Sequence, residues 1–112
     1  MRLEAAKLVW DAREAAGRIA RFTGGRSLDD YLGDEVAQSA VERQLEVIGD
    51  ALARLRTLDP ELARRVPRLH QLVAFRNLLM HQYGEIDGRL VWDFVKTRVP
   101  ALRETLRSLL PD

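Results

Sequence analysis

The residues best suited to chemistry lie close together near position 80. Arg76, Asn77, His81 and Tyr83 place a permanent cation, an amide, an imidazole and a phenol within one short and otherwise apolar stretch. An Arg presents donors that match phosphate oxygens, and an imidazole can accept or donate a proton near neutral pH. On a helix Asn77 and His81 lie one turn apart, whereas Arg76 and His81 point about 140° apart. A long Arg stem, fraying at the helix end or a second copy of the chain could bring these two groups together.

Apolar spacing predicts that this stretch belongs to the third of about four long helices. Apolar residues recur every three or four positions at 5–19, 41–55 and 91–109, which is the period of an amphipathic helix. No alternating run of β-branched residues suggests a sheet. Short connections between consecutive long helices favour antiparallel neighbours. We therefore predict one all-α domain over residues 1–112, an up-and-down antiparallel bundle of about four long helices with a short extra helical turn.

Glycine, proline and capping residues predict where these helices begin and end. Short turns are expected at 27–32, opened by a capping box at Ser27, and after residue 59, and Asp34 is expected to cap the long second helix. The third helix is expected to run from about Leu69 to Tyr83. Pro100 lies inside the last helix and is expected to kink or divide it.

Composition excludes several classes of protein. Cys is absent, which removes disulfides and thiolate chemistry, and with two His residues no metal site is predicted. Glu42, Glu46 and Asp50 recur every four residues and could bind a cation, but a solvated or partner-facing acidic edge is the simpler interpretation. No apolar run approaches the ~20 residues of a membrane span, and no signal-peptide pattern is present. A cytoplasmic protein is expected.

The net charge of +1 conceals a basic segment. Residues 54–76 hold six Arg against Asp59 and Glu61, a local charge of +4. One interpretation is Arg-rich composition on solvated helix faces, and the other is an anionic ligand near this segment.

At the stretch around position 80 the sequence resembles a known family. Arg76-Asn77-x3-His81-x-Tyr83 is similar to the RN-x3-H-x-Y signature of HEPN-domain proteins, specifically the HepT-like toxins. The resemblance extends over nearly all of the chain, through the segment 40–51, Pro67 and the pair 91–92. The chain departs from the family pattern at positions 50 and 68, where it has Asp and Arg.

The resemblance implies a function and a set of partners. It implies a metal-independent endoribonuclease toxin of a type VII-like HEPN/MNT pair, whose substrate is RNA and which needs no cofactor. The toxin would be active as a homodimer with its cleft at the interface. Arg76 and His81 would be catalytic and Asn77 supporting. The partner would be an MNT-type minimal nucleotidyltransferase antitoxin that neutralises the toxin by AMPylation of Tyr83. The chemistry of the residues agrees, because metal-free RNA cleavage needs a base, an acid and a cation for the phosphate.

Other interpretations stay open on the sequence alone. Arg76 could simply pair with a carboxylate of the second helix, His81 could be a helix C-terminal residue favoured by the dipole, and Tyr83 could be a packing aromatic. The chain could then be a noncatalytic dimeric helical adaptor that binds a nucleotidyltransferase or a nucleotide. The Arg/His pair separates the two hypotheses, since an adaptor has no chemical need for it.

Overall fold

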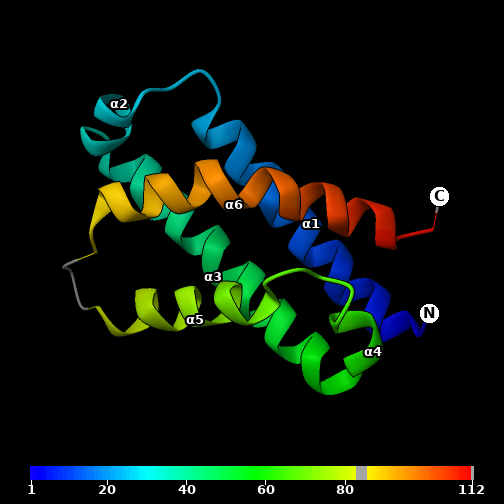
Figure 1. The fold of residues 1–112 in the computed structure, drawn as a ribbon. Helices are drawn as coiled ribbons and strands as arrows, with labels where there is room; N and C mark the ends of the chain where they lie inside the picture. Colours follow the sequence, from blue (N-terminus) through cyan, green and yellow to red (C-terminus); the bar gives the residue numbers. More distant parts are fainter. Residues whose placement is uncertain (83–85, 112) are drawn as a thin grey trace.

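The chain folds into a bundle of helices, seen here in a computed structural model that describes residues 1–82 and 86–111 (Figure 1). The four long helices are α1 (Leu3–Thr23), α3 (Glu35–Leu58), α5 (Leu69–His81) and α6 (Gly88–Leu109). Two short helices, α2 (Leu28–Leu32) and α4 (Pro60–Ala63), precede α3 and α5. The described residues contain no strand, so the predicted all-α bundle is confirmed.

Side-chain caps start four of the helices where the sequence places Ser or Asp. Ser27 and Asp30 form a reciprocal capping box at α2, which confirms the prediction. Asp34 accepts from the backbone N–H of Ala37 at the start of α3, and Asp59 accepts from that of Leu62 at α4. Each cap satisfies a backbone donor that has no partner within the helix.

The core lies where α1, α3 and α6 meet. Helix α1 packs along α3 on one side and against α6 on the other, while α5 packs mainly on α3 (Figure 1). The stripe that α1 presents is rich in alanine, which lets its neighbours approach closely. Larger side chains from the other two helices fill the space between, and the fully buried ones include Val41, Ile48, Leu52, Val91 and Leu106.

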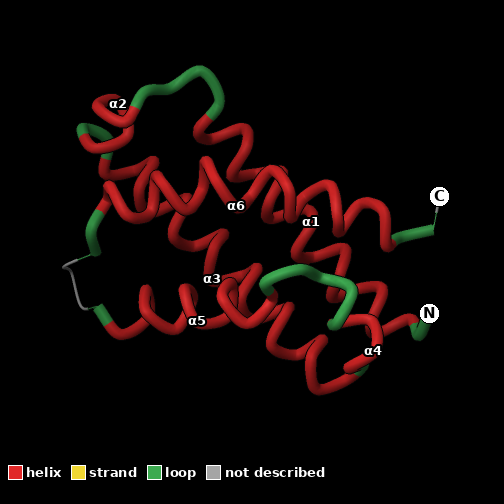
Figure 2. The backbone as a smooth tube through the Cα atoms, viewed as in Figure 1, coloured by secondary structure: helices red, strands yellow, loops and turns green. Residues whose placement is uncertain are grey.

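Helix α5 is held at one side of the bundle. It begins after a loop at 64–68, drawn green in Figure 2. Besides its contact with α3, it is joined to α6 by Phe75 and Phe94, whose rings stack with centroids 3.9 Å apart and planes 4° apart. Leu78 and Met80 on the same helix are 39% and 49% exposed. These two residues are two positions apart, so they point to opposite sides of α5, and each side exposes an apolar group among the described residues.

Two helices differ at one point each from what their sequences predict. Helix α6 runs unbroken from Gly88 to Leu109 through the exposed Pro100, so of the two expected outcomes, a kink or a division, the division does not occur. Packing of apolar residues on both sides of the proline keeps the helix in one piece. Helix α5 ends at His81 and Gln82 is its C-cap, whereas the expected end at Tyr83 lies outside the described residues. No described helix is long and apolar enough to cross a membrane.

Candidate active site

Gly49 in the middle of α3 places Arg76 against that helix. A Cβ atom at Gly49 would overlap the Cβ of Arg76 and lie 2.5 Å from its Cγ, far inside van der Waals contact. Because glycine has no Cβ, the backbones of α3 and α5 can approach closely at this point. The aliphatic stem of Arg76 fills the space, and the side chain is 22% exposed.

The guanidinium of Arg76 is held by two neighbours. Its Nη2 lies 3.3 Å from Oδ1 of Asp50 on α3, and its Nη1 donates to Oδ1 of Asn77 at 2.7 Å. The second oxygen of Asp50 lies 3.2 Å from Nε of Arg54 one helical turn further on. Asp50 thus lies between two guanidinium groups, and the pairing of Arg76 with a carboxylate of the second long helix, left open by the sequence, is present.

His81 is the last residue of α5, and its ring is held by Asn77, which also contacts Arg76. The Nδ1 atom lies 2.7 Å from the backbone carbonyl oxygen of Asn77. Since a carbonyl oxygen only accepts, Nδ1 carries the proton in this bond and donates it. The neutral ring then has its lone pair on Nε2, and the exposed side chain can take a proton from a group arriving from solvent.

Asn77 therefore links the two groups that the helical wheel separates. Its side-chain oxygen contacts Arg76 and its main-chain oxygen contacts His81. Asn77 and His81 are both exposed, so the region is open to solvent in a single copy of the chain. The fourth predicted site residue, Tyr83, lies outside the described residues.

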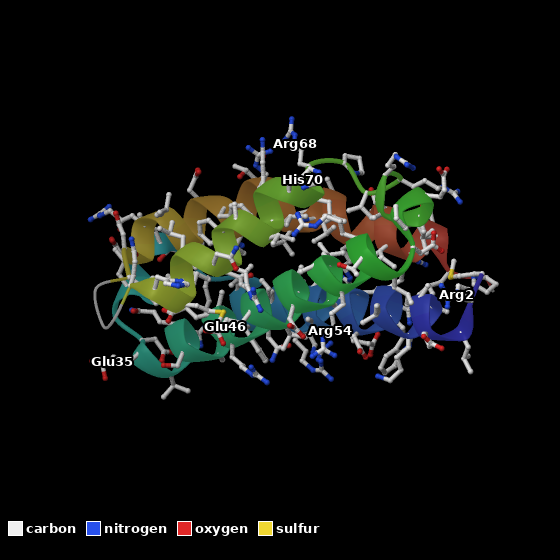
Figure 3. The ribbon with its side chains drawn as sticks, turned by 90° about the horizontal axis from the view of Figure 1, so that it is seen from below. Arg2, Glu35, Glu46, Arg54, Arg68 and His70 are labelled. Carbon is white, nitrogen blue, oxygen red and sulfur yellow. The ribbon has the colours of Figure 1, made fainter. Side chains whose placement is uncertain are left out.

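The acidic residues of α3 have different surroundings: Glu42 and Glu46 lie near one another, and Asp50 contacts Arg76. Burial raises the pKa of Glu42, and the neighbouring Glu46 raises it further. Glu46 itself lies 3.7 Å from Arg43. Figure 3 shows Glu46 and Arg54 along the same side of α3. Asp50 is a member of the Arg76 cluster rather than of a partner-facing edge. In residues 1–82 and 86–111 no three His, Asp or Glu side chains gather closely enough to hold a metal ion.

Sequence reasoning missed Gly49 and Asp50 as parts of this cluster. A glycine inside a helix costs about 1 kcal/mol relative to alanine. Its presence at the centre of a 24-residue helix is therefore a signal that another backbone comes close. That signal predicts where on α3 the contact lies, but it does not predict that Arg76 is the residue in contact.

Comparisons with known proteins agree with the resemblance in the motif. The family model described as Ribonuclease HepT-like matches residues 12–109. The chain belongs to the HepT-like ribonuclease family.

Two curated relatives cover most of its length. A protein of Thermococcus cleftensis named "Probable ribonuclease HepT" is 33% identical over 103 residues, which are 88% of this chain and 89% of the relative. A protein of Methanocaldococcus jannaschii named "Putative RNase MJ1380" is 30% identical over 98 residues, 86% of this chain and 87% of the relative. No solved structure gives a significant match.

Proposed function

We propose that this protein is a metal-independent endoribonuclease and the toxin of a HEPN/MNT toxin–antitoxin pair. The observation that carries the proposal is the exposed cluster in which Asn77 contacts both Arg76 and His81. Membership of the HepT-like ribonuclease family supports the same reaction class.

The proposed reaction needs only side chains of this kind. Nε2 of His81 takes the proton of a ribose 2′-OH, and the resulting oxygen attacks the adjacent phosphorus. Arg76 stabilises the charge on the pentacovalent phosphate. The bond from phosphorus to the 5′ oxygen breaks, and a protonated imidazole gives that oxygen its proton. The products are a 2′,3′-cyclic phosphate and a 5′-hydroxyl.

Because one chain carries a single motif histidine, the proposed enzyme is a homodimer that supplies one His81 as base and the other as acid. The face of α5 that carries the exposed Ala74 and Leu78, one turn apart, supports this arrangement, since exposed apolar residues that adjoin commonly mark contacts between proteins. The motif lies on the same helix, so pairing of two such faces would bring the two clusters toward a common cleft.

The test uses purified protein, total RNA and EDTA, with His81→Ala as the matched variant. We expect cleavage in EDTA, with ends that carry a 2′,3′-cyclic phosphate, and no cleavage by the variant. Absence of cleavage by the wild-type chain at any dose would refute the enzyme and leave the noncatalytic adaptor.

Regulation by an MNT-type nucleotidyltransferase forms the second part of the proposal. Transfer of AMP to Tyr83 would place bulk and negative charge two residues from His81, where an RNA phosphate must enter. After co-expression with the nucleotidyltransferase, the intact mass should rise by multiples of AMP. A gain that persists in Tyr83→Phe would exclude Tyr83 as the acceptor.

A further inference from the structure

A basic hollow lies at the other end of α5, where the loop after α4 leads into the helix. It has a volume of about 440 Å³ and its charged or titratable lining residues are Arg56, Arg64, Arg68 and His70. The remaining lining residues are apolar, no carboxylate is among them, and the imidazole of His70 is the one aromatic ring in the lining. We call this site the α4–α5 hollow. In Figure 3 Arg68 and His70 lie at the start of α5, and Arg54 and Glu46 lie along the neighbouring α3.

The positive charge of the hollow is only partly compensated. Arg64 pairs with Glu61 at 2.6 Å, an exposed contact of small energetic weight. Nη1 of Arg56 lies 2.9 Å from Nδ1 of His70, so the guanidinium donates to an imidazole that brings no negative charge. Among the described residues neither Arg56 nor Arg68 has a carboxylate partner. Both can therefore accept an anion from outside.

The backbone of Arg68 supplies an independent indication. It has φ 61° and ψ 27°, and it is the one non-glycine residue with positive φ among those described. A left-handed conformation costs a residue with a Cβ of order 1 kcal/mol, and such strain concentrates at functional sites. Arg68 lies between two hollows, since it also lines a second space of about 300 Å³ between α5 and α6. Arg98 lines that second space, and its Nη1 is buried with no hydrogen-bond partner among residues 1–82 and 86–111.

We propose that the α4–α5 hollow is a subsite that binds a backbone phosphate of single-stranded RNA through Arg56 and Arg68. The inference deepens the proposed function and rests on it for the identity of the ligand. A hollow lined mainly by guanidinium and apolar groups offers contacts to phosphate, and its one aromatic ring, the imidazole of His70, is already engaged by Arg56. Its position on the helix that carries Arg76 and His81 favours the same RNA strand over an unrelated anion.

Helix geometry fixes the length of RNA that could reach both sites. Eight residues separate Arg68 from Arg76, which is about 12 Å along the axis at 1.5 Å per residue. Residues eight positions apart also differ by about 80° around the axis, so 12 Å is a lower limit, and at about 3.4 Å per nucleotide of a stacked strand the subsite lies at least three or four nucleotides from the cleaved bond. A dinucleotide has a single phosphodiester and cannot occupy both sites, whereas a 12-mer can.

The first experiment measures binding without cleavage. The probe is a fluorescein-labelled 12-nucleotide oligouridylate, and the protein carries His81→Ala so that the strand stays intact. The test variant adds Arg56→Gln and Arg68→Gly, and the control adds Arg21→Gln and Arg103→Gln, two exposed arginines that both lie near Gly17 at the junction of α1 and α6. Each variant has two positive charges fewer than the parent chain, so the two variants differ in where those charges are removed and in the glycine at position 68.

We expect the test variant to bind the 12-mer roughly tenfold more weakly than the control at fixed salt. The slope of log affinity against log salt concentration should become less steep by about 0.7 for each RNA phosphate that is no longer neutralised. Glycine accepts the left-handed backbone at position 68 without strain, so thermal stability should be equal or higher and unfolding would not explain weaker binding. Equal affinities and slopes for the two variants would overturn the subsite.

The second experiment separates the subsite from the catalytic proposal. With His81 restored, kcat/KM is measured on the 12-mer and on a dinucleotide, and the ratio of the two should fall about tenfold in the test variant relative to the control. An unchanged ratio in an enzyme that cleaves RNA overturns the subsite alone. No cleavage by the wild type refutes the proposed function, and the binding experiment then still decides on the subsite. Weaker binding of AMP or inorganic phosphate without any change on the 12-mer would identify a small anion as the ligand and also overturn the proposal.

Discussion

Replacing Gly49 by alanine tests whether the contact between α3 and α5 positions Arg76. The added methyl would overlap the Cβ of Arg76 and approach its Cγ to 2.5 Å, about 1 Å short of the ~3.5 Å at which carbon atoms make contact. The Cβ of Arg76 is fixed to the backbone, so no change of rotamer relieves that overlap. The two helices must move apart near this point by at least about 1 Å.

The magnitude follows from two opposing effects. Alanine in place of glycine inside a helix stabilises by about 1 kcal/mol. Overpacking a closely packed contact costs about 1–3 kcal/mol, and an overlap with an atom fixed to the backbone belongs at the upper end. We expect Gly49→Ala to lower the free energy of unfolding by about 1–2 kcal/mol. For a domain of this size that corresponds to a fall in Tm of about 4–8 °C.

Gly17→Ala is the matched control, because Gly17 is also buried inside a long helix. A Cβ there would lie 3.7 Å from its nearest neighbour, the Nη2 of Arg103, which is an ordinary contact. Only the gain in helix propensity remains, so we expect this variant to be more stable than the wild type by roughly 0.5–1 kcal/mol.

Both variants are measured by thermal unfolding at one protein concentration and by RNA cleavage. Displacement of Arg76 by about 1 Å should lower cleavage by Gly49→Ala by one to two orders of magnitude, while Gly17→Ala keeps its activity. Equal stability and equal activity of the two variants would refute the view that the close approach at Gly49 holds Arg76 in place.

Three further predictions concern the same face of the molecule. Asp50→Asn should lower cleavage about tenfold, because Arg76 loses its ionic anchor. Tm should fall only slightly, because Asp50 is 46% exposed and water can replace its carboxylate at the partly buried guanidinium. A wild-type kcat would show that the anchor is dispensable. Glu42→Gln should stabilise the protein slightly at pH 7, because the raised pKa means that the folded state disfavours the carboxylate, and unfolding curves should show the gain vanish below about pH 4, where glutamate is protonated in both states. Leu78→Glu should convert the proposed dimer into a monomer in light-scattering chromatography, whereas Leu3→Glu, at an 85% exposed position, should not; a dimeric mass for Leu78→Glu would place the interface elsewhere.

The elements of the fold could be predicted because their signals are local. Apolar spacing of three and four residues marks the buried stripes of α1, α3 and α6, and Ser27, Asp34 and Asp59 mark helix starts through hydrogen bonds that span only a few residues. The division that the sequence allowed at Pro100 does not occur, because a proline removes one backbone hydrogen bond whereas apolar contacts hold α6 against α1 and α2.

The polar contacts between helices could not be predicted in the same way. Asp50 and Arg76 are 26 residues apart, and their contact depends on the relative rotation and distance of α3 and α5. Helical periodicity alone assigned Asp50 to an acidic edge with Glu42 and Glu46. Only the closeness of the two backbones at Gly49 brings Arg76 within reach of that carboxylate.

The two roles of Asn77 show how the candidate site is divided between backbone and side chain. A helical wheel suggests that its side chain orients His81, one turn away, but that ring is held by the main-chain carbonyl of residue 77, which any residue would supply. The side-chain oxygen contacts Arg76 instead, and an apolar residue at position 77 would remove that contact alone. The identity of residue 77 therefore bears on the orientation of the guanidinium, while the tautomer of the imidazole depends on α5 remaining helical up to its last residue.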